Sequence, residues 1–182
     1  DKGSLQFSAH GFVSQAGLFG WDKIDRGSEI LSRHIPLDLK GSGADFGCGY
    51  GYLSHHVLKT CPDLTMLSCI DADARAIAAT RENLKNYEER TTYIWADLTR
   101  ENNFSSSFDW IVMNPPFHEA KDTSVMTGEA FIKTAHSALK PGGVLWMVAN
   151  VHLPYERALH NHFKSVQKIY EGEGFKIYRS EK

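Results

Sequence analysis

The feature that most constrains the fold is a short apolar run, Trp110 to Met113, that stops at Asn114 and two consecutive prolines. A run of this length that ends abruptly is typical of a strand buried on both faces of a sheet. Proline fixes φ and has no backbone N–H, so the chain must leave the sheet after Asn114. The sequence therefore predicts a central strand whose end carries an amide and stiff carbonyl acceptors. A proline-rich turn that only closes the strand is the alternative.

Segments of strand character alternate with segments of helical spacing along the rest of the chain. Predicted strands cover residues 4–8, 44–46, 64–70, 91–96, 110–113, 144–149, 166–170 and 175–179. This alternation predicts an α/β fold with a mostly parallel sheet, right-handed crossovers and helices on both faces. The turn at 171–174 joins the last two strands into a hairpin, which adds one antiparallel strand.

The predicted helices follow apolar residues at helical spacing. The first begins at a cap on Asp25 and stops at Pro36. The others cover residues 53–59, 74–87, a segment that includes 131–139, and 155–163. In the segment 74–87, we expect Ile77, Ala78 and Leu84 to face inward.

Composition and charge exclude several classes of protein. The chain has 182 residues, of which 42% are hydrophobic, as expected for one globular domain. Its formal net charge of −2 gives no overall basic field, so contacts to nucleic acid would have to be local. No stretch reaches the roughly 18–20 apolar residues that a membrane span needs. The three cysteines and nine histidines form no metal-binding motif, and reduced thiols indicate the cytoplasm.

Glycine or polar residues directly follow four of the predicted strands: Gly47, Asp71, Asp97 and Asn114. In parallel sheets, ligands bind beyond the carboxyl ends of the strands. Any one of these aspartates could be a simple cap, but residues of this kind at four strand ends indicate a shared ligand site.

The glycine loop Asp45-Phe-Gly47-Cys-Gly49-Tyr-Gly51 narrows the choice of ligand. A dinucleotide fingerprint would need glycine where Tyr52 stands, and no Gly-Lys-Ser/Thr sequence ends the loop. Glycines nevertheless let the backbone lie close to a ligand. The Asp71 carboxylate suits a ribose diol and Asp97 suits an adenine amino group, a pair that fits S-adenosylmethionine better than NAD.

These motifs resemble those of the class I S-adenosylmethionine-dependent methyltransferases with the small-methyltransferase domain. The resemblance rests on Asp45-x-Gly47-x-Gly49-x-Gly51, Asp71, Asp97 and Asn114-Pro115-Pro116-Phe117. More narrowly, residues 19–28, 114–118 and 149–155 resemble the bacterial ribosomal RNA guanine-N2 methyltransferases, and the ending 175–179 fits the small-subunit enzymes best.

The resemblance implies one Rossmann-like methyltransferase domain over residues 1–182 with a seven-stranded sheet. Residues 41–182 would form its core, and residues 1–40 a strand, loop and helix extension. Family members carry a further domain before this one, so we expect a missing N-terminal domain that assists RNA binding. The implied partner is ribosomal RNA or a ribosomal subunit.

The same resemblance implies the site residues. The catalytic residues are expected to be Asn114, Pro115, Pro116 and Phe117, and no metal is expected. Cofactor contacts are expected from Asp25, Gly27, Asp45, Gly47, Cys48, Gly49, Gly51, Asp71, Ala72, Asp97, Leu98 and Asn114. The Asn114 side-chain oxygen and the Pro115 carbonyl would accept the two N–H groups of guanine N2, and Phe117 would stack on the flipped base.

Three alternative functions remain open from the sequence. The first is methylation of large-subunit ribosomal RNA at the same guanine atom. The second is methylation of adenine N6 or of a protein glutamine, which present a similar planar amine or amide. The third is an inactive module that binds the cofactor, although the intact glycine loop and acceptor cluster argue against it.

Overall fold

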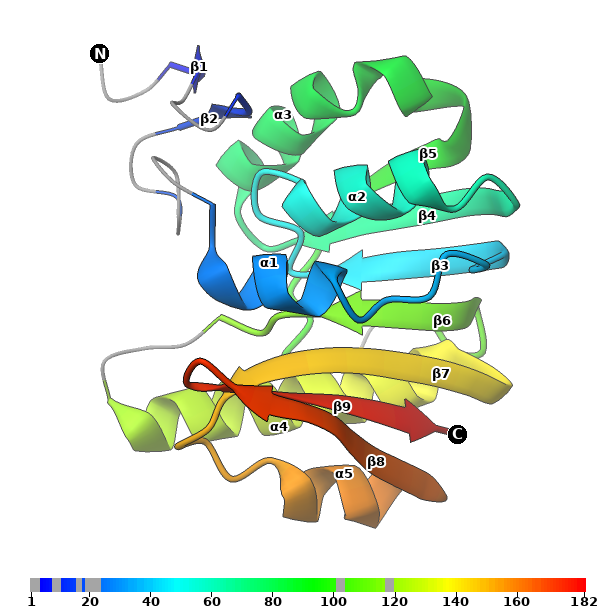
Figure 1. Cartoon of the computed structure of the whole chain (residues 1–182). Helices are drawn as coiled ribbons and strands as arrows, with labels where there is room; N and C mark the ends of the chain where they lie inside the picture. The colour runs from blue at the N-terminus through cyan, green and yellow to red at the C-terminus, as the bar shows by residue number, and fades with distance from the viewer. Residues whose placement is uncertain (1–3, 8–10, 16–17, 19–23, 101–103, 117–119) are drawn as a thin grey trace.

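The computed structural model describes residues 4–7, 11–15, 18, 24–100, 104–116 and 120–182 (Figure 1). Seven strands form one sheet in the order β5-β4-β3-β6-β7-β9-β8. Their bounds are β3 (Gly41–Phe46), β4 (Leu64–Asp71), β5 (Thr91–Trp95), β6 (Phe108–Met113), β7 (Leu139–Asn150), β8 (Ser165–Gly172) and β9 (Phe175–Glu181). Strands β3 to β7 pair in parallel, and β9 pairs antiparallel with β7 and β8. The predicted α/β fold with one antiparallel strand in the C-terminal hairpin is confirmed.

Helices cover both faces of this sheet, as Figure 1 shows. The helices are α1 (Arg26–Ser32), α2 (Tyr52–Thr60), α3 (Ala74–Asn83), α4 (Lys121–Ala138) and α5 (Glu156–His162). In β6, Trp110 and Val112 belong to the core under α1 and α2, whereas Ile111 and Met113 belong to the core under α4 and α5. Alternate side chains of a strand point to opposite faces, so this apolar run is buried on both sides, as predicted.

Several element bounds differ from the prediction. Helix α1 ends at Ser32, short of the predicted stop at Pro36. The Arg33 and His34 N–H groups still donate to the Ile30 and Leu31 carbonyls of the helix, but with turn-type spacing of three residues. The predicted helix 74–87 is α3 followed by a 3₁₀ segment, Lys85–Arg90, and the predicted helix end at Leu139 already belongs to β7. Helix ends depend on local packing and capping, which periodicity does not report.

The prediction of which side chains of the segment 74–87 face inward is only partly confirmed. Leu84 is buried, but Ala78 is exposed and Ile77 only partly buried, whereas Ala76, Ala79 and Thr80 are buried. The glycine loop lies against this helix, and the Thr80 hydroxyl donates to the Gly49 carbonyl at 2.8 Å. Contact with a distant loop therefore decides which small side chains of α3 are covered.

A short antiparallel ribbon, β1 (Gln6–Phe7) and β2 (Val13–Ser14), precedes α1. The sequence predicted the first strand and placed a loop at the second. Asn83 holds β2 in place, because its side chain accepts from the Val13 N–H and donates to the Val13 carbonyl, both at 2.7 Å. Two residues carry too little pattern to identify a strand without this contact.

A test of the core concerns Gly43 in β3. A Cβ atom there would lie 2.1 Å from the Trp110 ring. We expect Gly43→Ala to lower the free energy of unfolding by about 1–3 kcal/mol, because the indole must move in a packed core. Urea denaturation measures this change, with Ser42→Ala on the same strand as the control. An unchanged midpoint would contradict the close approach.

Candidate active site

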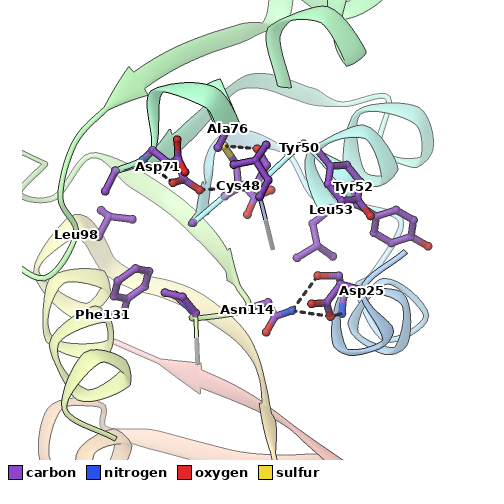
Figure 2. A pocket seen from close by; sticks show the side chains of 18 of the residues that line it. Asp25, Cys48, Tyr50, Tyr52, Leu53, Asp71, Ala76, Leu98, Asn114 and Phe131 are labelled. Atoms are coloured by element: carbon purple, nitrogen blue, oxygen red, sulfur yellow. Dashed lines mark hydrogen bonds between the residues drawn. The ribbon is translucent and has the colours of Figure 1, made fainter. Parts of the chain in front are cut away.

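A pocket of about 410 Å³ opens at the carboxyl ends of β3, β4, β5 and β6 (Figure 2). This is a volume typical of small-molecule sites. The pocket is lined by Leu18, Asp25, Ser28, Asp45, Gly47, Cys48, Gly49, Tyr50, Tyr52, Leu53, Asp71, Ala72, Asp73, Ala76, Ala96, Asp97, Leu98, Thr99, Asn114, Pro116, Thr127 and Phe131. The four residues that follow the predicted strands all belong to this lining.

The glycine loop after β3 forms one wall of the pocket. Gly47, Gly49 and Gly51 have φ values of 76°, 58° and 96°, in the left-handed region that favours glycine. The N–H groups of Gly47 and Cys48 donate to the Ile70 carbonyl at 2.8 and 3.0 Å, which joins the loop to β4. Burial raises the pKa of the Cys48 thiol, so this side chain stays protonated and acts as a small packing group.

Asp45 places a carboxylate at the bottom of the pocket, with only 1% of the residue exposed. One oxygen accepts from the Ser54 hydroxyl at 2.7 Å, and no described residue donates to Oδ1. Burial raises the pKa of Asp45 to about 7. A buried carboxylate oxygen without a donor is costly, so this atom provides a site for a cationic or N–H-bearing ligand group.

Asp71 ends β4 and faces the glycine loop. Its oxygens accept from the Gly49 N–H at 3.0 Å and from the Asp73 N–H at 2.9 Å. Burial raises the pKa of Asp71, while these backbone donors favour the ionised form. A carboxylate has about four acceptor positions, so these donors do not exhaust its capacity to accept from a ligand hydroxyl.

Asp97 follows β5 in a more exposed position. Its Oδ1 accepts from the Thr99 N–H at 2.9 Å and from the Thr99 hydroxyl at 2.6 Å. These bonds, the hydroxyl first, lower the pKa of Asp97. Oδ1 therefore stabilises the turn between Asp97 and Thr99. The other oxygen, Oδ2, lies 3.3 Å from the Arg100 guanidinium.

Asn114 stands at the end of β6 and is tied to the start of α1. Its Nδ2 donates to Asp25 Oδ1 at 3.2 Å and to Ser28 Oγ at 2.9 Å, as Figure 2 shows for Asp25. Asp25 also caps α1 by accepting from the Ser28 N–H, as predicted. A residue 86 positions away along the chain thus helps to hold the Asn114 amide.

The structure brings most of the predicted site residues together, with four exceptions. Gly27, Gly51 and Pro115 do not belong to the pocket lining, and Phe117 lies outside the described residues, as do His118 and residues 19–23 of the first matching stretch. Gly27 and Gly51 instead support close packing: a Cβ at Gly27 would lie 3.1 Å from Phe175, and one at Gly51 3.2 Å from Thr80.

Sequence reasoning also missed pocket residues that no local motif marks. Phe131 and Thr127 reach the pocket from α4, although Phe131 was assigned to the core from its helical spacing. Tyr50 and Tyr52 flank Gly51 where the glycine loop passes into α2, and this Tyr-Gly-Tyr sequence was the available signal.

The hydrogen-bond acceptors in the pocket fit S-adenosylmethionine. The unpartnered Asp45 oxygen suits the ammonium group of its amino-acid part, and Asp71 retains acceptor positions for its ribose. The loop glycines leave room for close backbone approach. Among the described residues, no group of three or more His, Cys, Asp or Glu side chains gathers to hold a metal ion. In the described part of the chain, no helix is both long and apolar enough to cross a bilayer.

Comparisons with known proteins identify the family. The family model described as the methyltransferase small domain matches residues 9–179. The chain is 37% identical over 167 residues to the ribosomal RNA small subunit methyltransferase C of Shewanella loihica, covering 91% of this chain and 47% of that protein. The protein of the same name from Photorhabdus laumondii is 36% identical over 166 residues, covering 91% and 48%. The chain thus spans about half the length of the curated relatives that it matches.

A solved structure shares the fold. The 16S rRNA N2 methyltransferase (RsmC) of T. thermophilus, in complex with AdoMet and guanosine, superposes with a TM-score of 0.80 at 25% identity. The match covers 94% of this chain and 47% of that one. The resemblance seen in the motifs is therefore confirmed over nearly the whole sequence, and this chain belongs to the methyltransferase small-domain family.

Proposed function

We propose that this chain transfers a methyl group from S-adenosylmethionine to the exocyclic N2 of a guanine in small-subunit ribosomal RNA. The observation that carries the proposal is the Asn114 amide, whose nitrogen is held by Asp25 and Ser28 beside the pocket that contains Asp45 and Asp71. The relatives named as small-subunit methyltransferases, and the relative solved with AdoMet and guanosine, support this substrate.

The cofactor would be held by the strand ends and the glycine loop. Asp45 would accept from the ammonium group, Asp71 from the ribose hydroxyls, and Asp97 would lie near the adenine amine, flanked by Ala72 and Leu98. When bound, this cofactor supplies an electrophilic methyl group and accepts the electrons of the broken carbon–sulfur bond. Gly47 and Gly49 provide backbone without side-chain obstruction.

The guanine amine would be oriented by the end of β6. The Asn114 oxygen and the Pro115 carbonyl would accept hydrogen bonds from its two N–H groups, so that the nitrogen lone pair turns towards the methyl group. After transfer, the methylated nitrogen would release one of its protons to solvent. Such positioning and charge stabilisation provide most of the acceleration in a reaction that needs no protein nucleophile. Phe117 would stack on the base, a contact worth about 1–3 kcal/mol.

The proposal extends to the protein context. Residues 1–182 would form one methyltransferase domain, acting in the cytoplasm with a further N-terminal domain that assists RNA binding. The relatives are about twice as long as the part that this chain matches, which supports only the further domain.

Transfer of a labelled methyl group tests the proposed function. Small ribosomal subunits from cells that lack the activity should accept label, and nucleoside analysis should identify N2-methylguanosine. Large subunits, naked RNA, DNA and a peptide release factor serve as parallel substrates. Label in adenine N6, in glutamine or in large subunits would replace the proposal with the corresponding alternative, and cofactor binding without any transfer would contradict catalysis.

The buried Asp45 predicts a pH dependence of cofactor binding. Burial raises the pKa of Asp45 to about 7 in the free protein, and a neighbouring ammonium group favours the ionised form. Below pH 7 binding must release a proton, so the affinity should fall as pH decreases, approaching tenfold per pH unit. Calorimetry with S-adenosylhomocysteine between pH 5.5 and 8.5 measures this slope. Asp45→Asn should bind weakly with no slope, whereas a flat wild-type profile would contradict the ammonium contact.

A further inference from the structure

The first turn of α1 carries two acceptors that face the amide of Asn114. Ser28 Oγ and Asp25 Oδ1 lie 2.9 and 3.2 Å from Nδ2. A carboxylate only accepts hydrogen bonds, so the amide nitrogen, and not the oxygen, must face Asp25. Among the described residues none donates to the Asn114 oxygen, which lies on the side away from these two acceptors (Figure 2).

The first turn of α1 also contacts the β8–β9 hairpin. Arg26 is paired with Glu173 in the β8–β9 turn, and Arg33 lies 3.7 Å from the same carboxylate. A Cβ at Gly27 would meet Phe175 at 3.1 Å, Asp25 Oδ1 at 3.2 Å and Asn114 Nδ2 at 3.3 Å. Gly27 therefore allows the helix start, the hairpin and the amide to approach closely.

We propose that Asp25 and Ser28 are positioning residues that fix the orientation of the Asn114 amide and turn its oxygen towards the acceptor amine. The inference rests on the proposed function for its catalytic meaning, while the orientation itself is independent of the substrate. The amide group of asparagine is nearly symmetric in shape, so only its hydrogen-bond partners select one orientation. Without them, both orientations and intermediate angles become populated.

Ser28→Ala is the informative variant, because it removes one acceptor and retains a good helix former. The matched control is Ser32→Ala on the same helix, where the buried hydroxyl donates to the Glu29 carbonyl at 2.6 Å and does not contact Asn114. Ser28→Thr keeps a hydroxyl and is the rescue variant. Asp25→Ala also removes the helix cap, so it serves only as a second acceptor deletion.

The first measurement follows the side-chain amide of Asn114 by nitrogen-15 NMR, with Asn114→Ala to assign the signal. Solvent exchange of the amide protons should accelerate at least about fivefold in Ser28→Ala, as expected for loss of one of two hydrogen bonds. Ser32→Ala and Ser28→Thr should exchange as the wild type does. Equal exchange in Ser28→Ala and Ser32→Ala would overturn the orienting contact, whatever the enzyme methylates.

The second measurement is methyl transfer under the conditions that the proposed function defines. Ser28→Ala should lower kcat about tenfold, with the cofactor dissociation constant within about threefold of wild type, because misplacement of a reacting group reduces turnover without removing a binding contact. Ser28→Thr should recover most of the activity. An altered NMR signal with normal kcat would overturn the positioning role, and a normal signal with reduced kcat would assign Ser28 to another step. Absence of transfer in the wild type would contradict the proposed function and leave the NMR result standing.

Discussion

Asn114→Ala should lower turnover by about a hundredfold to a thousandfold, with the dissociation constant of the cofactor changed less than about fivefold. Removal of one preorganised polar group at a reacting centre has an effect of this size. Asn114 ends β6 directly beside the pocket, and its amide is held by Asp25 and Ser28. Single-turnover methyl transfer and calorimetry with S-adenosylhomocysteine measure the two quantities.

Asn150 provides the matched control for this experiment. It ends the neighbouring strand β7, its side chain accepts from the His152 N–H at 3.0 Å, and it does not belong to the pocket lining. Asn150→Ala should retain turnover within about threefold. A turnover of Asn114→Ala within tenfold of wild type would contradict its role at the acceptor amine.

Asp71→Ala should weaken cofactor binding by about a hundredfold or more. Hydrogen bonds to a charged group contribute about 1.5–3 kcal/mol each, and the ribose diol would provide two. The same substitution releases the Gly49 N–H, so the glycine loop also loses its anchor. Calorimetric titration with S-adenosylhomocysteine measures the affinity, and turnover should largely recover at saturating cofactor.

Asp109→Ala is the control for the loss of a carboxylate. Asp109 also accepts a backbone N–H, from Ser42 at 2.9 Å, but it lies at the start of β6 and outside the pocket lining. Loss of the Asp109 carboxylate should leave the cofactor affinity within about threefold of the wild-type value. Asp71→Asn retains one acceptor oxygen, so its cofactor affinity should lie between those of Asp71→Ala and Asp109→Ala. Wild-type affinity in Asp71→Ala would remove the ribose assignment.

The order of strands and helices was predictable because it follows from local patterns. The run from Trp110 to Met113 is apolar at every position, and the structure buries it on both faces of the sheet. The glycine spacing in the loop and the polar residues at strand ends are equally local. Sheet topology then brings the carboxyl ends of parallel strands to one edge, so Asp71, Asp97 and Asn114 meet in one pocket.

Element ends and side-chain orientations were less predictable, since they depend on packing between distant segments. Thr80 and Ala79 face inward because the glycine loop lies on α3, and the strand Val13–Ser14 depends on Asn83. The helical spacing of Phe131 predicts a core residue. In the structure its side chain belongs both to the core cluster and to the lining of the pocket.

The sequence by itself determined the α/β fold, the family and the set of strand-end residues from which a site can be built. Only the tertiary structure decided that Asp45 keeps a buried oxygen without a donor and that Ser28 holds an amide 86 residues away. The physical reason is the range of the interactions. Periodicity and turn chemistry act over a few residues, whereas burial and hydrogen-bond partners are set when segments far apart in the chain pack together.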